Sequence, residues 1–99
     1  MQLELDLERV SLGGGPTPVR ELSRLGGDGG RAPVWIKDDG AYSAFGGNKA
    51  RKLEWLLADA RRRRKRTILT GGALGTNHGL VTALFARRLG MRTVLVLVP

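Results

Sequence analysis

The stretch TILTGGALGTNHGLVTALFARRLGMRTVLVLV, Thr67–Val98, decides the fold of this 99-residue chain. It predicts a strand over Thr67–Thr70, a glycine-rich loop over Gly71–Gly75, a helix over Asn77–Leu89 that stops at Gly90, and a second strand over Thr93–Val98. A strand, a crossover helix and a strand form a βαβ unit, here residues 67–98, whose two strands run parallel. Because Val94–Val98 is apolar without alternation, we expect this strand to be covered on both faces.

The remaining two thirds of the sequence add a few further elements to this unit. We expect a helix from Lys49 to about Arg62 and a short strand over Pro33–Lys37. We also expect a short helical turn within Val19–Leu25 and an extended segment at Leu3–Leu7. The apolar residues that recur at helical spacing on the first helix are Leu53, Leu56, Leu57 and Ala60, with Trp55 flanking them.

These elements predict an α/β fold with a partial three-layer arrangement, in which helices flank a parallel sheet of about three strands. Such a sheet is incomplete, because two long helices and three strands are fewer than an α/β domain normally contains. We therefore predict that residues 1–99 are the N-terminal portion of a larger domain.

Composition excludes several classes of function. The chain has no cysteine and one histidine, which excludes thiolate metal sites and argues against a histidine-based one, so no metal is expected. No apolar run is long enough to span a membrane, so we expect no membrane partner and a cytoplasmic location.

The net charge of +8 is concentrated in one run, RRRRKR at Arg61–Arg66, which carries six of these charges. The run lacks interleaved aromatic residues for base stacking, and it lies where a helix is predicted to end. We interpret it as a solvated helix end and expect no nucleic-acid partner. Two alternatives stay open: a small basic nucleic-acid-binding protein that uses this run, and a truncated product without function.

A second informative stretch is FGGNKARKLEWLL, Phe45–Leu57, in which a loop becomes a helix. Asn48 is a preferred N-cap residue, so Lys49 is predicted in the first helical turn. A cation there faces the positive end of the helix dipole, which favours the neutral amine that imine formation requires. The alternative is an ordinary solvated lysine.

The loop GGALGTNHG, Gly71–Gly79, is the other candidate site. Its spacing fits neither a Walker loop nor a dinucleotide fingerprint, so its backbone N–H groups are better suited to a carboxylate. Thr76 and Asn77 would add hydroxyl and amide donors, and His78 a group that titrates near neutrality. The alternative is a tight turn with Asn77 as an ordinary N-cap.

The run GGNKARKLEWLLADA, Gly46–Ala60, resembles the lysine motif of pyridoxal-phosphate enzymes of the tryptophan-synthase-β type, which have fold type II. It is most similar to the branch that contains 1-aminocyclopropane-1-carboxylate deaminase and D-cysteine desulfhydrase. PTPVREL (Pro16–Leu22) and WIKDDG (Trp35–Gly40) are similar to upstream segments of this branch, and Gly71–Leu89 continues the match in order. The resemblance runs from about Leu7 to Pro99 and implies an N-terminal fragment, since family members are roughly three times as long.

The resemblance implies pyridoxal 5'-phosphate as the cofactor and assigns roles to three residues. Lys49 matches the catalytic lysine that forms a Schiff base with the cofactor and moves the substrate's α-proton. Asn77 matches the asparagine that hydrogen-bonds the phenolic oxygen of the cofactor, and Asn48 matches a supporting position before the lysine.

Substrate-binding residues follow from the same resemblance. Thr76, together with Gly75, Asn77 and His78 in the same loop, matches the segment that binds the substrate carboxylate, although threonine stands where the family usually has serine. The implied activity is that of a deaminase or lyase acting on a small amino acid, such as 1-aminocyclopropane-1-carboxylate or a D-cysteine-like compound. A homodimer is implied for the full-length enzyme, and little or no turnover is expected of the 99-residue chain.

Overall fold

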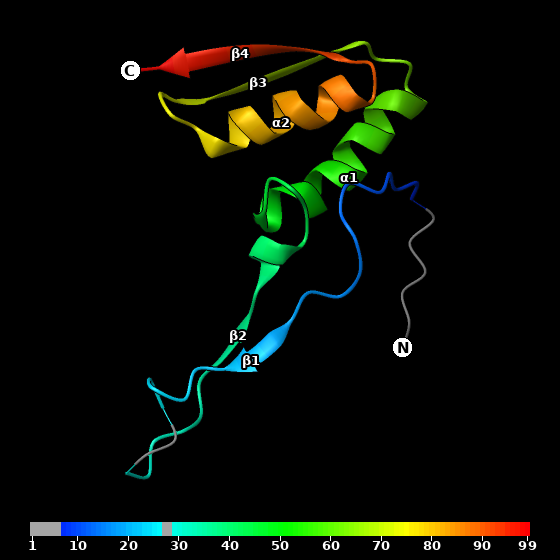
Figure 1. Cartoon of the computed structure of the whole chain (residues 1–99). Helices are drawn as coiled ribbons and strands as arrows, with labels where there is room; N and C mark the ends of the chain where they lie inside the picture. The colour runs from blue at the N-terminus through cyan, green and yellow to red at the C-terminus, as the bar shows by residue number, and fades with distance from the viewer. Residues whose placement is uncertain (1–6, 27–28) are drawn as a thin grey trace.

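The computed structural model describes residues 7–26 and 29–99 (Figure 1). Its elements, in chain order, are β1 (Val19–Glu21), β2 (Trp35–Lys37), the 3-10 turn η1 (Asp39–Ala41), α1 (Gly47–Arg62), β3 (Thr67–Ala73), α2 (Asn77–Arg88) and β4 (Arg92–Val98). This order confirms the α/β class. Of the segment expected to be extended at the N-terminus, Leu7 has no regular structure and the residues before it lie outside the described ranges.

The predicted βαβ unit is present. Strands β3 and β4 pair in parallel, from Thr67 opposite Arg92 to Ala73 opposite Val98, and α2 connects them. The glycine-rich loop is shorter than predicted, because Gly71 and Gly72 belong to β3. Glycine is needed at the second of these positions, where a Cβ would lie 2.7 Å from the Thr76 hydroxyl oxygen at the start of the next helix.

Strands β1 and β2 form a separate antiparallel pair that extends away from the helices (Figure 1). The prediction of a helical turn within Val19–Leu25 is wrong for Val19–Glu21, which is a strand because it pairs with Trp35–Lys37. The strand predicted at Pro33–Lys37 is confirmed over its last three residues. Within the described ranges the parallel sheet has two strands, fewer than the three or so predicted.

The hydrophobic core lies between α1, α2 and the segment that precedes β1. Its buried apolar residues are Val10, Leu12, Tyr42, Ala50, Leu53, Leu57, Ala58, Val81, Phe85, Ala86 and Met91. Leu56, predicted on the apolar face of α1, is 61% exposed, whereas Glu54 is only 2% exposed. The buried face of α1 is therefore rotated from the predicted one, because Glu54 has polar partners inside the core: the backbone N–H of Leu12 and the hydroxyl of Tyr42.

Only one face of the parallel sheet is covered in the described part of the chain. Leu95 of β4 faces α2, since a Cβ added at Gly79 of that helix would lie 2.7 Å from its side chain. On the opposite face Leu69 is 71% exposed and Val96 is 53% exposed. The apolar sequence of β4 predicted cover on both faces, so this sheet has the incompleteness that the sequence indicated.

The basic run Arg61–Arg66 lies at the C-terminal end of α1 and in the turn after it, where every side chain is exposed. Asp59 binds Arg62 at 2.6 Å and Arg63 at 2.8 Å. This placement supports its interpretation as a solvated helix end, because cations are favourable at a helix C-terminus. No helix within the described ranges is long and apolar enough to cross a membrane.

Candidate functional site

Lys49 lies in the first turn of α1, as predicted, but the helix begins earlier than Asn48. Its N-cap is Gly46, with φ of 68°, and Gly47 follows with φ of 57°. Both conformations are left-handed and favour glycine, so the two glycines turn the chain into the helix. The prediction of Asn48 as N-cap is therefore wrong: it is the second helical residue and its side chain is exposed.

The first turn of α1 has an unusual electrostatic character. The N-cap makes no side-chain hydrogen bond and the turn contains no acidic residue, whereas the last turn carries Arg61 and Arg62. Within the described ranges the ammonium of half-buried Lys49 has no hydrogen bond and no ion pair. The turn thus presents N–H groups and an amine but no carboxylate, an arrangement suited to an anionic or carbonyl-bearing ligand.

The loop before α2 is held by Thr76, whose hydroxyl oxygen accepts a 3.2 Å hydrogen bond from the backbone N–H of Gly79. Thr76 is therefore the N-cap of α2, and the alternative that gave this role to Asn77 is wrong. Gly75, with φ of 79°, makes the turn in which the N–H of Thr76 bonds the carbonyl of Ala73 at 3.0 Å. Asn77 is left with an exposed side chain at the first helical position.

Three backbone N–H groups of this loop are free to bind a ligand. Leu74 and Thr76 donate to backbone carbonyls, but Gly75, Asn77 and His78 have no acceptor among the described residues. Free N–H groups at a helix start form a site for carboxylate or phosphate oxygens. The loop therefore retains the anion-binding capacity that its sequence suggested.

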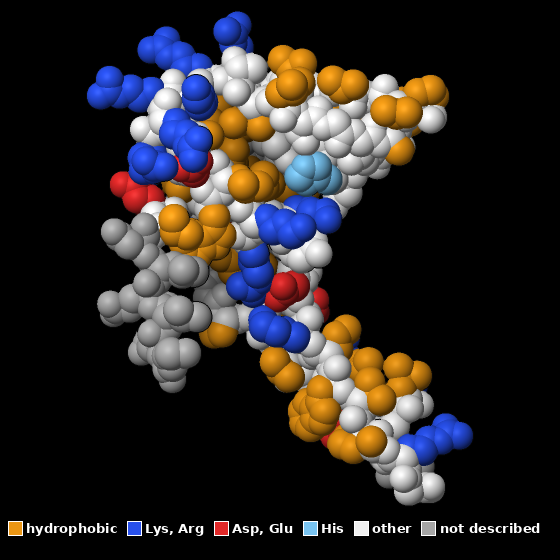
Figure 2. All heavy atoms as spheres, turned by 180° about the vertical axis from the view of Figure 1, so that it is seen from behind, with side chains coloured by type: hydrophobic (Ala, Val, Ile, Leu, Met, Phe, Trp, Pro, Cys, Tyr) orange, Lys and Arg blue, Asp and Glu red, His pale blue; other side chains and the backbone are white. Residues whose placement is uncertain are grey.

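His78 is tied to the sheet. Its Nε2 lies 3.1 Å from the Thr70 hydroxyl oxygen on β3, and the side chain is half-buried. Figure 2 shows the imidazole at the surface, in pale blue, with lysine or arginine side chains below it. In Figure 1, α1 and α2 run in similar directions, so their first turns lie toward the same side of the molecule. Among the described residues, Lys49 forms no hydrogen bond with the loop before α2.

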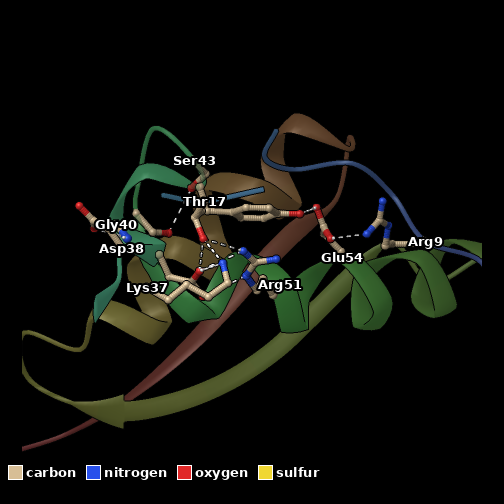
Figure 3. Close-up of polar contacts among 11 residues, drawn as sticks. Arg9, Thr17, Lys37, Asp38, Gly40, Ser43, Arg51 and Glu54 are labelled. Atoms are coloured by element: carbon tan, nitrogen blue, oxygen red, sulfur yellow. Dashed lines mark hydrogen bonds and ion pairs between the residues drawn. The ribbon is translucent and has the colours of Figure 1, made fainter. Parts of the chain in front are cut away.

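Sequence reasoning missed a polar cluster around Asp39, in which the side chains of Thr17, Lys37 and Arg51 point toward one another (Figure 3). Arg51 binds both carboxylate oxygens of Asp39, with Nε to Oδ2 at 3.0 Å and Nη2 to Oδ1 at 2.9 Å. Thr17 donates to Oδ1 at 2.8 Å, and Lys37 donates to the same oxygen at 3.1 Å and to the Thr17 hydroxyl. The hydrogen bonds from Arg51, then Thr17 and Lys37, hold the pKa of Asp39 well below its usual value. The available sequence signal was the basic and acidic residues within WIKDDG, Trp35–Gly40.

A model of the pyridoxal-phosphate dependent enzyme family matches residues 10–99. The chain belongs to this family. It is 45% identical to D-cysteine desulfhydrases of Salmonella paratyphi A and Klebsiella pneumoniae strain 342, over 90% of this chain and 27% of each relative. A crystal structure of an ACC deaminase homologue is 42% identical, with a TM-score of 0.84, over 93% of this chain and 28% of that one. The chain thus spans about a quarter of the length of these relatives, and the predicted branch and fragment character are confirmed.

The polar groups described above fit the cofactor of this family. Pyridoxal phosphate offers an aldehyde carbon to an amine, and it carries phenolate and phosphate oxygens that need donors. Lys49 supplies a primary amine without a competing carboxylate in its turn, and Asn77 supplies an exposed amide beside free backbone N–H groups. In the described ranges no three histidine, cysteine, aspartate or glutamate side chains cluster as metal ligands would.

A cavity of about 570 Å³ lies elsewhere, lined by Leu7, Glu8, Trp55, Leu56, Asp59 and Arg62. It contains none of the predicted site residues. We base the candidate site on Lys49 and the loop before α2, because those groups carry the amine and the donors that the family's chemistry requires.

Replacing Thr76 with alanine is expected to lower the free energy of unfolding by about 1 kcal/mol, because the Gly79 N–H loses its acceptor. Urea unfolding followed by circular dichroism measures this loss. Thr76→Ser should retain most of the stability, and Thr67→Ala, at an exposed threonine of β3, should change it by less than about 0.5 kcal/mol. Equal losses for Thr76→Ala and Thr67→Ala would show that the cap is not needed.

Proposed function

We propose that this chain supplies the lysine-bearing part of a pyridoxal-phosphate enzyme that deaminates, or eliminates a group from, a small amino acid. The observation that carries the proposal is the placement of Lys49 in the first turn of α1, within a sequence 45% identical to D-cysteine desulfhydrases over 90% of this chain. The substrate class, an amino acid such as D-cysteine or 1-aminocyclopropane-1-carboxylate, is inferred from the names of these relatives and of the ACC deaminase homologue.

Two residues would hold the cofactor together with Lys49. The Lys49 amine would hold the cofactor through its aldehyde carbon, with loss of water, and the side-chain amide of Asn77 would donate a hydrogen bond to the phenolic oxygen. Asn48, exposed on the same turn as the lysine, supports this site. When bound, the cofactor supplies an electron sink next to the substrate's α-carbon. Once the substrate amine has displaced it from the cofactor, the freed Lys49 amine would hold and move the α-proton.

The loop before α2 would bind the substrate carboxylate. The free N–H groups of Gly75, Asn77 and His78 can donate to its oxygens, and the half-buried hydroxyl of Thr76 lies beside them. His78 is held at Nε2 by Thr70 and would border this site without reacting. A homodimer and a cytoplasmic location stay predictions, as does the low turnover of the 99-residue chain, which spans 27% of its relatives.

Covalent labelling tests the assignment of Lys49. After incubation with pyridoxal phosphate and reduction with borohydride, we expect the cofactor mass mainly on Lys49, because this half-buried amine lies at a helix start whose N–H groups favour an anionic ligand and whose first turn has no acidic residue. Peptide mass spectrometry measures the occupancy at each lysine.

The matched control is Lys52, an exposed lysine one turn further along the same helix. Lys49→Ala should abolish the preferential labelling and also the visible absorbance of the bound cofactor before reduction, whereas Lys52→Ala should retain both. Equal labelling of the two lysines in the unmodified chain would refute the assignment.

A further inference from the structure

The first turn of α1 has little of its own to keep it ordered. Its cap is Gly46 without a side-chain hydrogen bond, and the preceding turn depends on two consecutive left-handed glycines. Glycine has the largest backbone freedom of any residue, so a helix start built in this way is prone to fray. A reactive amine in such a turn must be held by contacts from elsewhere in the chain.

Besides the buried Ala50, which packs this turn on the core, those contacts come from the cluster around Asp39. Arg51 lies two residues after Lys49 and binds Asp39 through two hydrogen bonds at 2.9 and 3.0 Å. Its guanidinium also lies 4.0 Å from the centre of the Tyr42 ring. Residues two positions apart on an α-helix are separated by about 200° around its axis, so Arg51 is anchored on the side nearly opposite Lys49. The anchor therefore fixes the rotation of the turn without occupying the lysine side.

Asp39 joins two further parts of the chain to this anchor. Thr17, which is buried, reaches it from the segment before β1, and Lys37 reaches it from β2 (Figure 3). The phenol of Tyr42 continues the contacts to the next helical turn by donating a 2.7 Å hydrogen bond to Glu54. Three segments that are distant in sequence, containing Thr17, Lys37–Tyr42 and Arg51, thus meet at the base of one helical turn.

The exposure of these groups indicates what the cluster contributes. The side chains of Arg51 and Asp39 are 38% and 29% exposed, and ion pairs with this access to water add little to global stability. A bidentate arginine–carboxylate pair nevertheless fixes geometry well, because the planar guanidinium accepts one orientation. The cluster is therefore better suited to ordering one turn than to stabilising the whole fold.

We infer that Asp39 and Arg51 are positioning residues that clamp the first turn of α1 and so set the place of Lys49. Neither touches the reacting atoms. The inference rests on the proposed role of Lys49, but the clamp itself is a claim about local order that is measured separately. It also predicts insensitivity to mild acid: because the pKa of Asp39 is lowered, its stabilising effect is present above the ordinary aspartate value and is lost only at much lower pH.

Asp39→Asn tests the inference, and Asp59→Asn is its matched control. Asp59 also binds two arginines, Arg62 and Arg63, but at the opposite end of the same helix. In Asp39→Asn we expect the amides of residues 51–53 to exchange hydrogen about tenfold faster, because a frayed turn opens their hydrogen bonds to residues 47–49. Asp59→Asn should leave these amides unchanged. Both variants should keep the circular dichroism spectrum and similar melting temperatures.

Labelling by pyridoxal phosphate provides the second measurement. In Asp39→Asn the preference for Lys49 over Lys52 should fall toward one, whereas Asp59→Asn should preserve it. If the unmodified chain shows no preference, the proposed function fails, and the exchange result alone judges the clamp. If the preference exists and Asp39→Asn leaves both it and the exchange rates unchanged, the clamp is refuted. Arg51→Gln, which retains the side-chain stem, must give the same result as Asp39→Asn and replaces it if that variant does not fold.

Discussion

Glu54→Ala is expected to lower the free energy of unfolding by about 3 kcal/mol or more. The carboxylate of Glu54 is 2% exposed, and its Oε1 accepts hydrogen bonds from the Leu12 N–H at 3.0 Å and the Tyr42 hydroxyl at 2.7 Å. Alanine leaves both buried donors without an acceptor, and each unsatisfied donor costs about 1–3 kcal/mol. Arg9, whose Nη1 lies 3.7 Å from Oε2, loses its partner as well.

Urea unfolding measures this loss, and the m-value serves as a check on two-state behaviour. The control is Glu8→Ala, at an exposed glutamate of the N-terminal segment that carries Arg9 and Leu12. It should change the free energy of unfolding by less than about 0.5 kcal/mol. Tyr42→Phe removes one of the two donors together with its need for an acceptor, so it should cost less than Glu54→Ala. Similar values for Glu54→Ala and Glu8→Ala would contradict the role of the buried carboxylate.

Phe85→Ala is expected to cost about 3–5 kcal/mol, the range for deleting a large buried aromatic side chain. Phe85 is fully buried on α2, and its ring packs edge-on against Phe45 with centroids 5.4 Å apart. Phe45 directly precedes the two glycines that start α1, so the lost contact also loosens the junction of the two helices. Small domains have only about 5–15 kcal/mol of stability, so this variant should be partly unfolded at physiological temperature.

The control for Phe85→Ala is Leu80→Ala, which truncates an exposed leucine of the same helix and should have little effect. Phe85→Leu should lie between the two, since it refills part of the cavity. Thermal unfolding followed by circular dichroism ranks the three variants. An unchanged midpoint for Phe85→Ala would show that the contact between the helices does not hold the fold.

The elements of the βαβ unit could be predicted because their signals are local. An uninterrupted apolar run marks Val94–Val98, and Gly90 ends the helix before it, so neighbours in sequence determine both features. Strand β1 could not be predicted in this way. Its conformation depends on pairing with Trp35–Lys37, which no pattern within Val19–Glu21 reveals.

The same distinction applies to the candidate site. The position of Lys49 in a first helical turn could be predicted, because the residues beside it in sequence mark the start of a helix. The burial of Glu54 could not be predicted, because a glutamate between Leu53 and Trp55 is normally expected to face solvent. Its partners, Leu12 and Tyr42, contact it only in the folded chain. The clamp of Asp39 and Arg51 was missed for the same reason.

In the part of the chain that the structure describes, one face of the β3–β4 sheet is uncovered, and this matters for the chain in a cell. Leu69, Val94 and Val96 present a contiguous apolar strip of the kind that chaperones bind and quality-control proteases inspect. We therefore expect the abundance of the chain to depend on the shielding of that strip as well as on the folding equilibrium. The half-life of the chain in a cell, rather than its melting temperature, is the quantity that reports whether the apolar strip is covered.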